Sequence, residues 1–255
     1  MKKLFFLLSL CLLFGFNAQA QTSVCATKII AKQNTQIRLV GDSMMNDEIW
    51  GYPRLFALKI AAKYTDATVI FKSRNYPGTG DGSTTNTTMQ TGTGGYTVTI
   101  VRDAISGSTS CRADAPGLIF APSDHCAAIG LAVNDAIRFG VDGNYTPATL
   151  AANLRYMGLW ARETYGTEIM LIEPAWSEYE PDPRIEIAGA AWVVRKTAKL
   201  NGFLVAPFRT TLENHYVGSG QAGQGNWFPN QMDNTHCGGD CHVALANTLF
   251  AAYGL

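Results

Sequence analysis

A serine directly after a short apolar segment is the first residue of this chain that could act as a nucleophile. Residues 37–40 are mostly aliphatic, which predicts a buried strand, and Gly41, Asp42 and Ser43 follow it. In an open parallel sheet, ligands bind beyond the carboxyl ends of the strands, so we expect Ser43 at the mouth of a site. A helix beginning just after Ser43 would point backbone N–H groups at the same place. Because a strand ending in Gly-Asp-Ser is most often only a turn, the hypothesis of a nucleophile needs further residues.

A serine nucleophile needs a base, and usually an acid that orients the base. The chain has four histidines, His125, His215, His236 and His242. His236 has Asp233 three residues before it, in a segment rich in turn-forming residues. At that spacing a carboxylate can fold back onto one imidazole nitrogen while the other nitrogen faces outward. His236 is therefore the favoured base, although a structural role is the more common one for an arbitrary histidine.

Two further predicted strands also end in small or polar residues. Residues 96–104 alternate in polarity and the pattern breaks at 106–109, which include Gly107. Residues 127–133 form a continuous apolar run that ends in Asn134. Three strands that each end in such a residue indicate a site more strongly than any one of them.

The rest of the chain alternates predicted helices and strands. Helices are expected from Tyr52 onward, over 146–165, around 187–198 and over 244–253, and further strands at 67–71, 168–173 and 203–206. Residues 76–95 are rich in Gly and Thr and predict a long surface loop. Strands alternating with helices predict an α/β fold, with a parallel sheet covered on both faces. No domain boundary is evident, so residues 21–255 are expected to form a single domain.

The first twenty residues have the pattern of a secretory signal peptide. Lys2 and Lys3 precede an apolar run over 4–16, and 18–20 read Ala-Gln-Ala, a small-x-small cleavage pattern. The run is too short for an ordinary transmembrane helix, and no later segment is apolar enough to span a bilayer. We therefore expect a signal peptide over 1–20, a secreted or periplasmic chain, and no stable membrane insertion.

The charge balance is nearly neutral. The chain has 20 Lys and Arg against 20 Asp and Glu, and removing the two lysines of the signal peptide leaves 18 against 20. There is no basic stripe, which argues against nucleic acid as a partner. Oligomeric state cannot be predicted from these features.

Five cysteines remain after the signal peptide, and export makes disulfides the default interpretation. Proximity in sequence favours Cys111–Cys126 and Cys237–Cys241 and leaves Cys25 as the odd thiol, although connectivity cannot be deduced from sequence. The alternative, zinc held by two of these cysteines and two nearby histidines, lacks the second distant pair of ligands typical of structural zinc sites. Its ligands would be Cys237, Cys241, His236 and His242. We predict no metal or other cofactor.

Taken together, the motifs resemble the SGNH, or GDSL-type, hydrolase family. The ordered set is Gly41-Asp42-Ser43, Gly107, Asn134 followed by Asp135, and Asp233-x-x-His236. The resemblance covers nearly the whole mature chain. It implies a three-layer α/β/α sandwich around a five-stranded parallel sheet, similar to flavodoxin. One departure is Ala132, where the family usually has glycine, and this puts the aim of Asn134 in doubt.

The resemblance also implies a serine esterase mechanism. Ser43 would attack an ester carbonyl, His236 would act as general base and then general acid, and Asp233 would orient His236. The oxyanion would be held by the backbone N–H groups of Ser43 and Gly107 and by the side-chain amide of Asn134. Glycine suits position 107 because the backbone must approach the substrate closely.

The substrate is less well defined than the reaction. A short acyl ester, such as an acetyl group on a glycan, is favoured, with Trp50, Trp176 or Trp227 as surfaces on which a sugar could stack. A lipase or lysophospholipase, a thioesterase and an acyltransferase are alternatives within the family. The alternative from another class is a non-catalytic domain that binds glycans or proteins.

Overall fold

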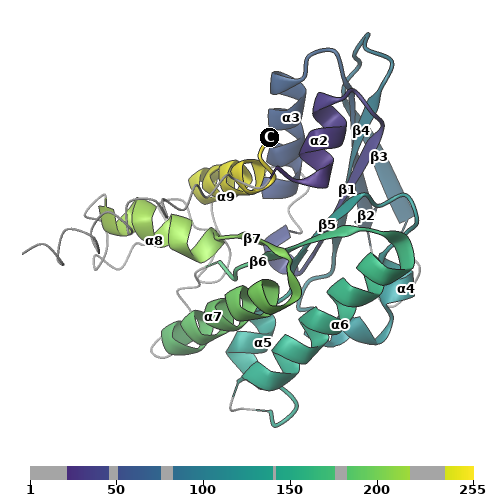
Figure 1. Cartoon of the computed structure of the whole chain (residues 1–255). Coiled ribbons are helices and arrows are strands. Elements are labelled where there is room, and N and C mark those ends of the chain that lie inside the picture. The colour runs from purple at the N-terminus through teal and green to yellow at the C-terminus, as the bar shows by residue number, and fades with distance from the viewer. Residues whose placement is uncertain (1–21, 46–50, 76–82, 140–141, 176–182, 219–238) are drawn as a thin grey trace, which may run out of the picture.

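A computed structural model describes residues 22–45, 51–75, 83–139, 142–175, 183–218 and 239–255 of the chain. Its centre is a seven-stranded sheet with helices on both faces (Figure 1). The strands are β1 Thr35–Gly41, β2 Thr68–Asn75, β3 Ser83–Gln90, β4 Thr97–Ala104, β5 Cys126–Gly130, β6 Glu168–Ile172 and β7 Leu204–Ala206. Their order in the sheet is β3-β2-β4-β1-β5-β6-β7, and only β3 runs antiparallel to its neighbour.

Helices cover the sheet in two layers. The α-helices are α2 Val24–Ile30, α3 Tyr52–Lys63, α4 Pro116–Ile119, α5 Val133–Arg138, α6 Pro147–Tyr165, α7 Pro183–Asn201, α8 Phe208–Gly218 and α9 Gly239–Ala252. Two short 3-10 helices, η1 Ser43–Met45 and η2 Ser110–Asp114, follow β1 and β4. Figure 1 shows α2, α3 and α9 on one face of the sheet and α5, α6 and α7 on the other.

Each face of the sheet has its own hydrophobic core. Successive side chains of a strand point to opposite faces, so Ile37 and Leu39 of β1 pack with α2, α3 and α9, whereas Val40 packs with α6 and α7. In β5, Ala128 and Ala127 divide between the two cores in the same way. The predicted three-layer α/β/α arrangement is confirmed.

The predicted five-stranded parallel sheet is wrong. The six strands expected from the apolar segments all form and run parallel, and β3 adds a seventh, antiparallel strand at the edge, paired with β2. β3 lies in the segment 76–95, which was predicted to be a loop because it lacks large apolar residues. Threonine is β-branched and favours strands, and an edge strand exposed on one side needs little apolar burial. Composition therefore misled the prediction for this segment.

The ends of α6 show why its prediction succeeded. Thr146 caps the helix, because its hydroxyl accepts the Thr149 N–H at 3.1 Å while the Thr149 hydroxyl accepts the Thr146 N–H at 2.7 Å. Pro147 occupies the first turn, and Gly166 ends the helix with a φ of 73°. By contrast, α2 and α8 were not predicted. α2 has only seven residues, too few to show a helical period, and polar residues separate the buried Phe208 and Leu212 of α8.

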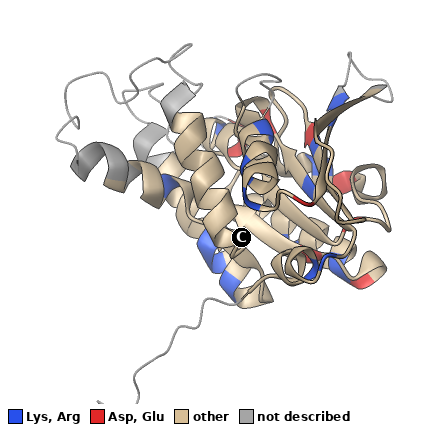
Figure 2. Ribbon diagram, turned by 90° about the horizontal axis from the view of Figure 1, so that it is seen from above, with Lys and Arg blue, Asp and Glu red and all other residues tan. Residues whose placement is uncertain are grey.

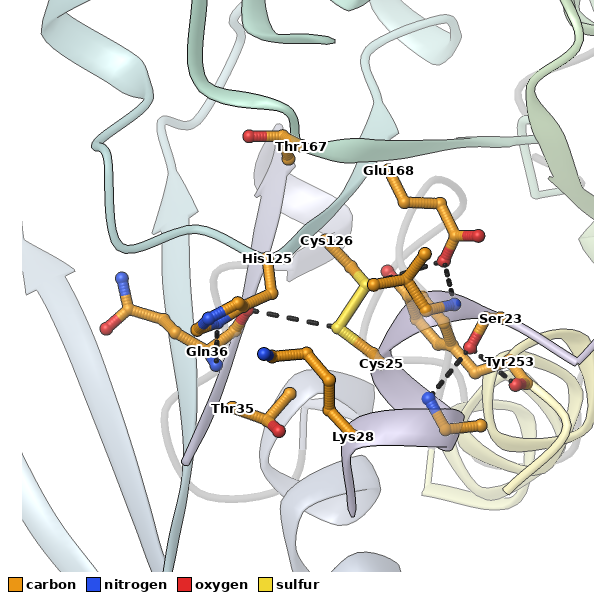
Figure 3. Close-up of a disulfide and its surroundings, with 12 residues drawn as sticks. Ser23, Cys25, Lys28, Thr35, Gln36, His125, Cys126, Thr167, Glu168 and Tyr253 are labelled. Carbon is orange, nitrogen blue, oxygen red and sulfur yellow. Dashed lines mark hydrogen bonds between the residues drawn. A yellow bond between two sulfur atoms is a disulfide. The ribbon is translucent and has the colours of Figure 1, made fainter. Parts of the chain in front are cut away.

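A disulfide joins α2 to β5, in a pairing that proximity in sequence does not suggest (Figure 3). Cys25 bonds Cys126 across 101 residues of sequence, and Cys111 is free and exposed. The predicted Cys111–Cys126 bridge is therefore wrong, as is the odd thiol at Cys25. Cys241 is also disulfide-bonded, but Cys237 lies outside the described residues, so the Cys237–Cys241 bridge stays a prediction.

The contacts around this disulfide explain the pairing. The Glu168 carboxylate accepts the Val24 N–H at 2.9 Å, and the Ser23 hydroxyl donates to the carbonyl of Tyr253 at 2.7 Å. Both contacts hold the start of α2 against strand and helix ends from distant parts of the chain (Figure 3). Three-dimensional packing, rather than spacing along the chain, brings Cys25 to Cys126.

Removing the Cys25–Cys126 disulfide is expected to destabilise the protein strongly. In the chain-entropy model, cross-linking a loop of about 100 residues lowers the entropy of the unfolded chain and so raises the free energy of unfolding by roughly 4–5 kcal/mol. The double variant Cys25→Ser/Cys126→Ser should therefore melt about 10 °C below the parent. Calorimetry measures the shift, and Cys111→Ser is the matched control because that thiol is free. Equal melting temperatures for the double variant and the parent would contradict the prediction.

Several predictions concern residues that the structure does not describe. The signal peptide over 1–20 and the three candidate tryptophans, Trp50, Trp176 and Trp227, all lie outside the described residues. Among the described helices, none has both the length and the apolar character needed to cross a membrane. Figure 2 shows basic and acidic residues interspersed over several helices and strands of the described chain.

Candidate active site

The register of the sheet brings the carboxyl ends of the three predicted strands together. β1 lies between β4 and β5, and Gly41 at its carboxyl end is paired with Ala104 of β4 and with Gly130 of β5. Ser43 comes two residues after Gly41. Gly107 comes three residues after Ala104, and Asn134 comes four residues after Gly130. Because all three strands are parallel, the segments that follow them lie at the same end of the sheet, beyond the carboxyl ends of the strands.

The turn after β1 presents Ser43 at the start of η1. The Asp42 side chain accepts the Met44 N–H at 3.0 Å, and the Asp42 carbonyl accepts the Met45 N–H at 3.1 Å. Asp42 is buried, while Ser43 is partly exposed. A Cβ at Gly41 would lie 2.3 Å from the sulfur of Met45, which is itself buried. The glycine and the acid of this motif thus each have a structural reason for their position.

Gly107 lies in an exposed turn directly after β4. The turn is closed by the Ser108 N–H, which donates to the Ile105 carbonyl at 3.1 Å. Gly107 has a φ of +71°, a conformation that residues with a side chain rarely adopt. There is open space where a Cβ would lie, so glycine is needed here for its backbone conformation and not to avoid a clash.

Asn134 lies in the first turn of α5, with its amide turned toward the β4 turn. Its Nδ2 donates to the Ser108 carbonyl at 3.0 Å, which leaves the second N–H of the same amide to point elsewhere. Ala132 has φ −104° and ψ −14°, an ordinary conformation for alanine. The departure from the family's usual glycine therefore introduces no backbone strain before Asn134.

Asp135, the neighbour of Asn134, fastens α5 to η2. Its carboxylate accepts the Ser110 N–H at 2.8 Å and the Ser110 hydroxyl at 2.5 Å, and Asn153 of α6 donates to the same hydroxyl at 3.0 Å. Burial raises the pKa of the Asp135 carboxyl, while the bonds from Ser110 oppose that shift. The adjacent Asn134 is consequently fixed relative to the loop that contains Gly107.

Replacing Asn134 by alanine is expected to lower kcat for ester hydrolysis by about 10²–10³-fold, the usual effect of losing one oxyanion donor. KM should change little, because the lost hydrogen bond forms with the charged oxygen of the transition state. Steady-state kinetics on p-nitrophenyl acetate measure both constants. Asn144→Ala, in the exposed turn before α6, is the matched control, and an equal loss of kcat in both variants would contradict the role of Asn134.

The structure describes the surroundings of two of the four histidines. His125 precedes β5, so it lies at the amino end of the strands, opposite Ser43, and its Nδ1 accepts the Gln36 N–H at 3.0 Å. His242 is buried in α9, and its Nδ1 accepts the Tyr52 N–H at 3.3 Å. The position of His125 excludes it as the base for Ser43.

The favoured base and its orienting acid, His236 and Asp233, lie outside the described residues, and their roles stay predictions. The alternative zinc site would also use His236 and Cys237, which are not described, and Cys241, which is disulfide-bonded. Among the described side chains, no group of three His, Cys, Asp or Glu residues could hold a metal ion.

The sequence does not predict that two further polar residues lie near the site. Ser108 and Arg112 both donate to the carbonyl of Gly41, at 3.2 and 3.4 Å. Their types and spacing match no motif that sequence reasoning recognises. Only the pairing of β1 with β4 shows that the segment after one strand contacts the end of the other.

Comparisons with known proteins agree on the fold. LAE5, an alpha/beta hydrolase enzyme from the metagenome of Lake Arreo, is 16% identical, with a TM-score of 0.62 over 87% of this chain and 96% of its own. A protein from Parabacteroides merdae described as a GDSL-like lipase is 17% identical, with a TM-score of 0.62 and coverage of 88% and 97%. Axe2, an acetylxylan esterase from Geobacillus stearothermophilus, is 17% identical, with a TM-score of 0.61 and the same coverage.

No model of a protein family matches the sequence, and neither does any curated protein sequence. At 16–17% identity, the solved structures establish the architecture of the chain. The chain therefore has the fold that LAE5, the GDSL-like lipase and Axe2 share, and its resemblance to the SGNH hydrolases is confirmed at the level of the fold.

Proposed function

We propose that the chain is a carboxylic ester hydrolase that acts through an acyl-enzyme on Ser43. The observation that carries this proposal is the placement of Ser43, Gly107 and Asn134 after three adjacent parallel strands. A nucleophile, a backbone N–H donor and a side-chain amide donor are among the parts that acyl transfer needs. The shared fold with proteins described as a lipase and an acetylxylan esterase supports the same reaction class.

In this mechanism His236 takes the proton of the Ser43 hydroxyl as Oγ attacks the ester carbonyl. The carbonyl oxygen becomes an oxyanion, held by the Ser43 and Gly107 N–H groups and the Asn134 amide. Collapse of the tetrahedral intermediate breaks the ester bond, and His236 gives its proton to the leaving alcohol. His236 then deprotonates a water molecule that attacks the carbonyl of the acyl-enzyme. Collapse of this second tetrahedral intermediate breaks the bond between Ser43 Oγ and the acyl group, releases the acid and returns the proton from His236 to Ser43, while Asp233 keeps the imidazole oriented throughout.

Labelling tests this proposal directly. A fluorophosphonate probe should modify the full chain, and peptide mapping should place the label on Ser43, with loss of p-nitrophenyl acetate hydrolysis in proportion to the label. An unlabelled, inactive protein that still binds glycans would instead support the non-catalytic alternative.

A small cavity beside the site favours short acyl groups. Its volume is about 20 Å³, enough for roughly one water-sized or methyl-sized group. Asp42 and Met44, on either side of Ser43, line it together with Val133, the neighbour of Asn134. The methyl group of an acetyl ester fits this volume, whereas a butyryl chain needs the lining to move.

Part of the cavity wall is aromatic and aliphatic, beside the carboxylates of Asp42 and Glu173. Tyr52, Phe208 and Leu245 form part of it, and the rings of Tyr52 and Phe208 meet edge to face at 5.1 Å. Burial, together with the nearby Asp42 carboxylate, raises the pKa of the Tyr52 hydroxyl well above its ordinary value, so that hydroxyl stays neutral. These walls suit the apolar end of an acyl group.

Enlarging the cavity is expected to shift the preference toward longer acyl chains. Leu245→Ala should raise the ratio of kcat/KM for p-nitrophenyl butyrate over acetate by about 10-fold, since a methylene in an apolar pocket is worth roughly 10-fold or more. Leu249→Ala, one turn later in α9, is the matched control, because Leu249 is equally buried but does not line the cavity. The same ratio in both variants would remove the cavity as the acyl site.

For the alcohol part of the substrate, we infer an acetylated glycan. Axe2 is described as an acetylxylan esterase, which supports this inference. The predicted export of the single domain 21–255 also supports it, because an exported enzyme can reach glycans outside the cell. The disulfide between Cys25 and Cys126 is consistent with an extracellular protein. Acetate release from acetylated xylan, compared with lysophospholipid and thioester hydrolysis, separates this substrate from the lipase and thioesterase alternatives.

A further inference from the structure

The carbonyl of Gly41 accepts several donors from one neighbouring segment. The Ile105 N–H lies 3.1 Å from this oxygen, the Ser108 hydroxyl 3.2 Å and Arg112 Nη1 3.4 Å. All three donors belong to the segment that follows β4, whereas Gly41 ends β1, two residues before Ser43. The end of the nucleophile's strand is therefore attached to the segment that contains Gly107 by side chains as well as by backbone.

Ser108 connects all three parts of the proposed oxyanion hole. It directly follows Gly107, its hydroxyl donates to the Gly41 carbonyl, and its own carbonyl accepts the Asn134 amide at 3.0 Å. A shift of this one residue would move the Gly107 N–H relative to both the Ser43 turn and the Asn134 side chain. Oxyanion donors lose much of their effect when displaced by about 1 Å.

Arg112 also bonds the Gly41 carbonyl, and its side chain is mostly buried. Its Nη2 donates to the buried Asp103 carboxylate at 2.6 Å, and its Nη1 donates to the Asp103 carbonyl at 3.2 Å as well as to Gly41. The Arg112 side chain is 12% exposed and that of Asp103 is fully buried. Because Asp103 belongs to β4, the guanidinium joins the ends of β1 and β4 through a charge-assisted contact.

We propose that Ser108 and Arg112 are positioning residues, which set the distance between the Ser43 turn and the Gly107 and Asn134 donors by bonding the Gly41 carbonyl. This inference rests on the proposed ester hydrolase function. Neither residue touches the reacting atoms in this role. Their effect is expected in the transition state, when the oxyanion forms, and not in the binding of the uncharged ester.

The first test removes a single oxygen atom. Ser108→Ala should lower kcat for p-nitrophenyl acetate by about 10-fold and leave KM within about two-fold, whereas Ser108→Thr, which keeps the hydroxyl, should restore most of the loss. A purely structural role would lower the melting temperature without this split between kcat and KM. Ser123→Ala, an exposed serine near the amino ends of the strands, is the matched control.

The second test compares two arginines that share Asp103. Arg74 donates to the Asp103 carboxylate at 3.3 Å, as Arg112 does, and it also donates to the carbonyl of Leu118 at 2.7 Å. Arg112→Met should lower kcat by about 10²-fold and Arg112→Lys by about 10-fold. Arg74→Met should leave kcat within about two-fold of the parent even where it destabilises the protein.

The outcomes separate this inference from the proposed function. If the parent hydrolyses esters and labels at Ser43, and Ser108→Ala and Arg112→Lys keep the parent's kcat, the positioning role is overturned and the ester hydrolase stands. Equal losses in Arg112→Met and Arg74→Met would also overturn it, because Asp103 alone would then account for both. If the parent neither hydrolyses esters nor labels, the proposed function fails, and the positioning role fails with it.

Discussion

Replacing Ser43 by alanine is expected to lower kcat for p-nitrophenyl acetate by about 10⁶-fold. In an enzyme with a catalytic triad, removal of the serine nucleophile lowers kcat by about this factor, because the base then has no hydroxyl to deprotonate. The variant should retain roughly 10³–10⁴-fold catalysis over water, since the Gly107 and Asn134 donors remain. Hydrolysis measured at high enzyme concentration can follow a rate this slow, and the fluorophosphonate label should disappear from the variant.

Ser123→Ala is the control for this experiment as well. Ser123 is exposed, and its hydroxyl accepts a hydrogen bond from the Gln36 side chain at 2.8 Å, near the amino ends of the strands. Its replacement should leave both hydrolysis and labelling at the level of the parent. Activity of Ser43→Ala within ten-fold of the parent would show that another residue is the nucleophile.

Local patterns in the sequence predict part of the geometry that this experiment depends on. Ser43, Gly107 and Asn134 each follow a segment whose apolar pattern is strong, and strong patterns define buried parallel strands well. Once the three strands are parallel and adjacent, their ends must meet, as the pairing of Gly41 with Ala104 and Gly130 shows. The adjacency itself came from the family resemblance, because strand order leaves no trace in local patterns.

The errors lie where local patterns are weak or absent. The threonine-rich strand β3 is exposed at an edge of the sheet, so it shows no apolar periodicity and its composition predicts a loop. The Cys25–Cys126 disulfide depends on how α2 packs beside β5, which spacing along the chain cannot reveal. In both cases tertiary contacts determine the structure.

The positioning residues illustrate a further limit. Ser108 and Arg112 act on the carbonyl of Gly41, a backbone group that is the same in every residue. A serine and an arginine in a polar segment are ordinary surface residues by composition. Their partners become visible only when the paired strands place that segment over the end of β1.

The choice of His236 as the base leads to the second large expected effect. His236→Ala should lower kcat by about 10⁶-fold, as much as the loss of Ser43, because a serine hydroxyl without a base is a weak nucleophile. The double variant Ser43→Ala/His236→Ala should be no slower than either single variant, since the two residues act as one unit. This non-additivity distinguishes a catalytic pair from two residues that each support the fold.

His125 provides the control for His236. It lies at the amino end of β5, away from Ser43, and its Nδ1 already accepts the Gln36 N–H, so His125→Ala should keep the kcat of the parent. His242, buried in α9 six residues after His236, is the one described histidine that could compete for the role. If His242→Ala abolished hydrolysis while His236→Ala remained active, the base would be His242, and the Asp233-x-x-His236 motif would lose its catalytic assignment.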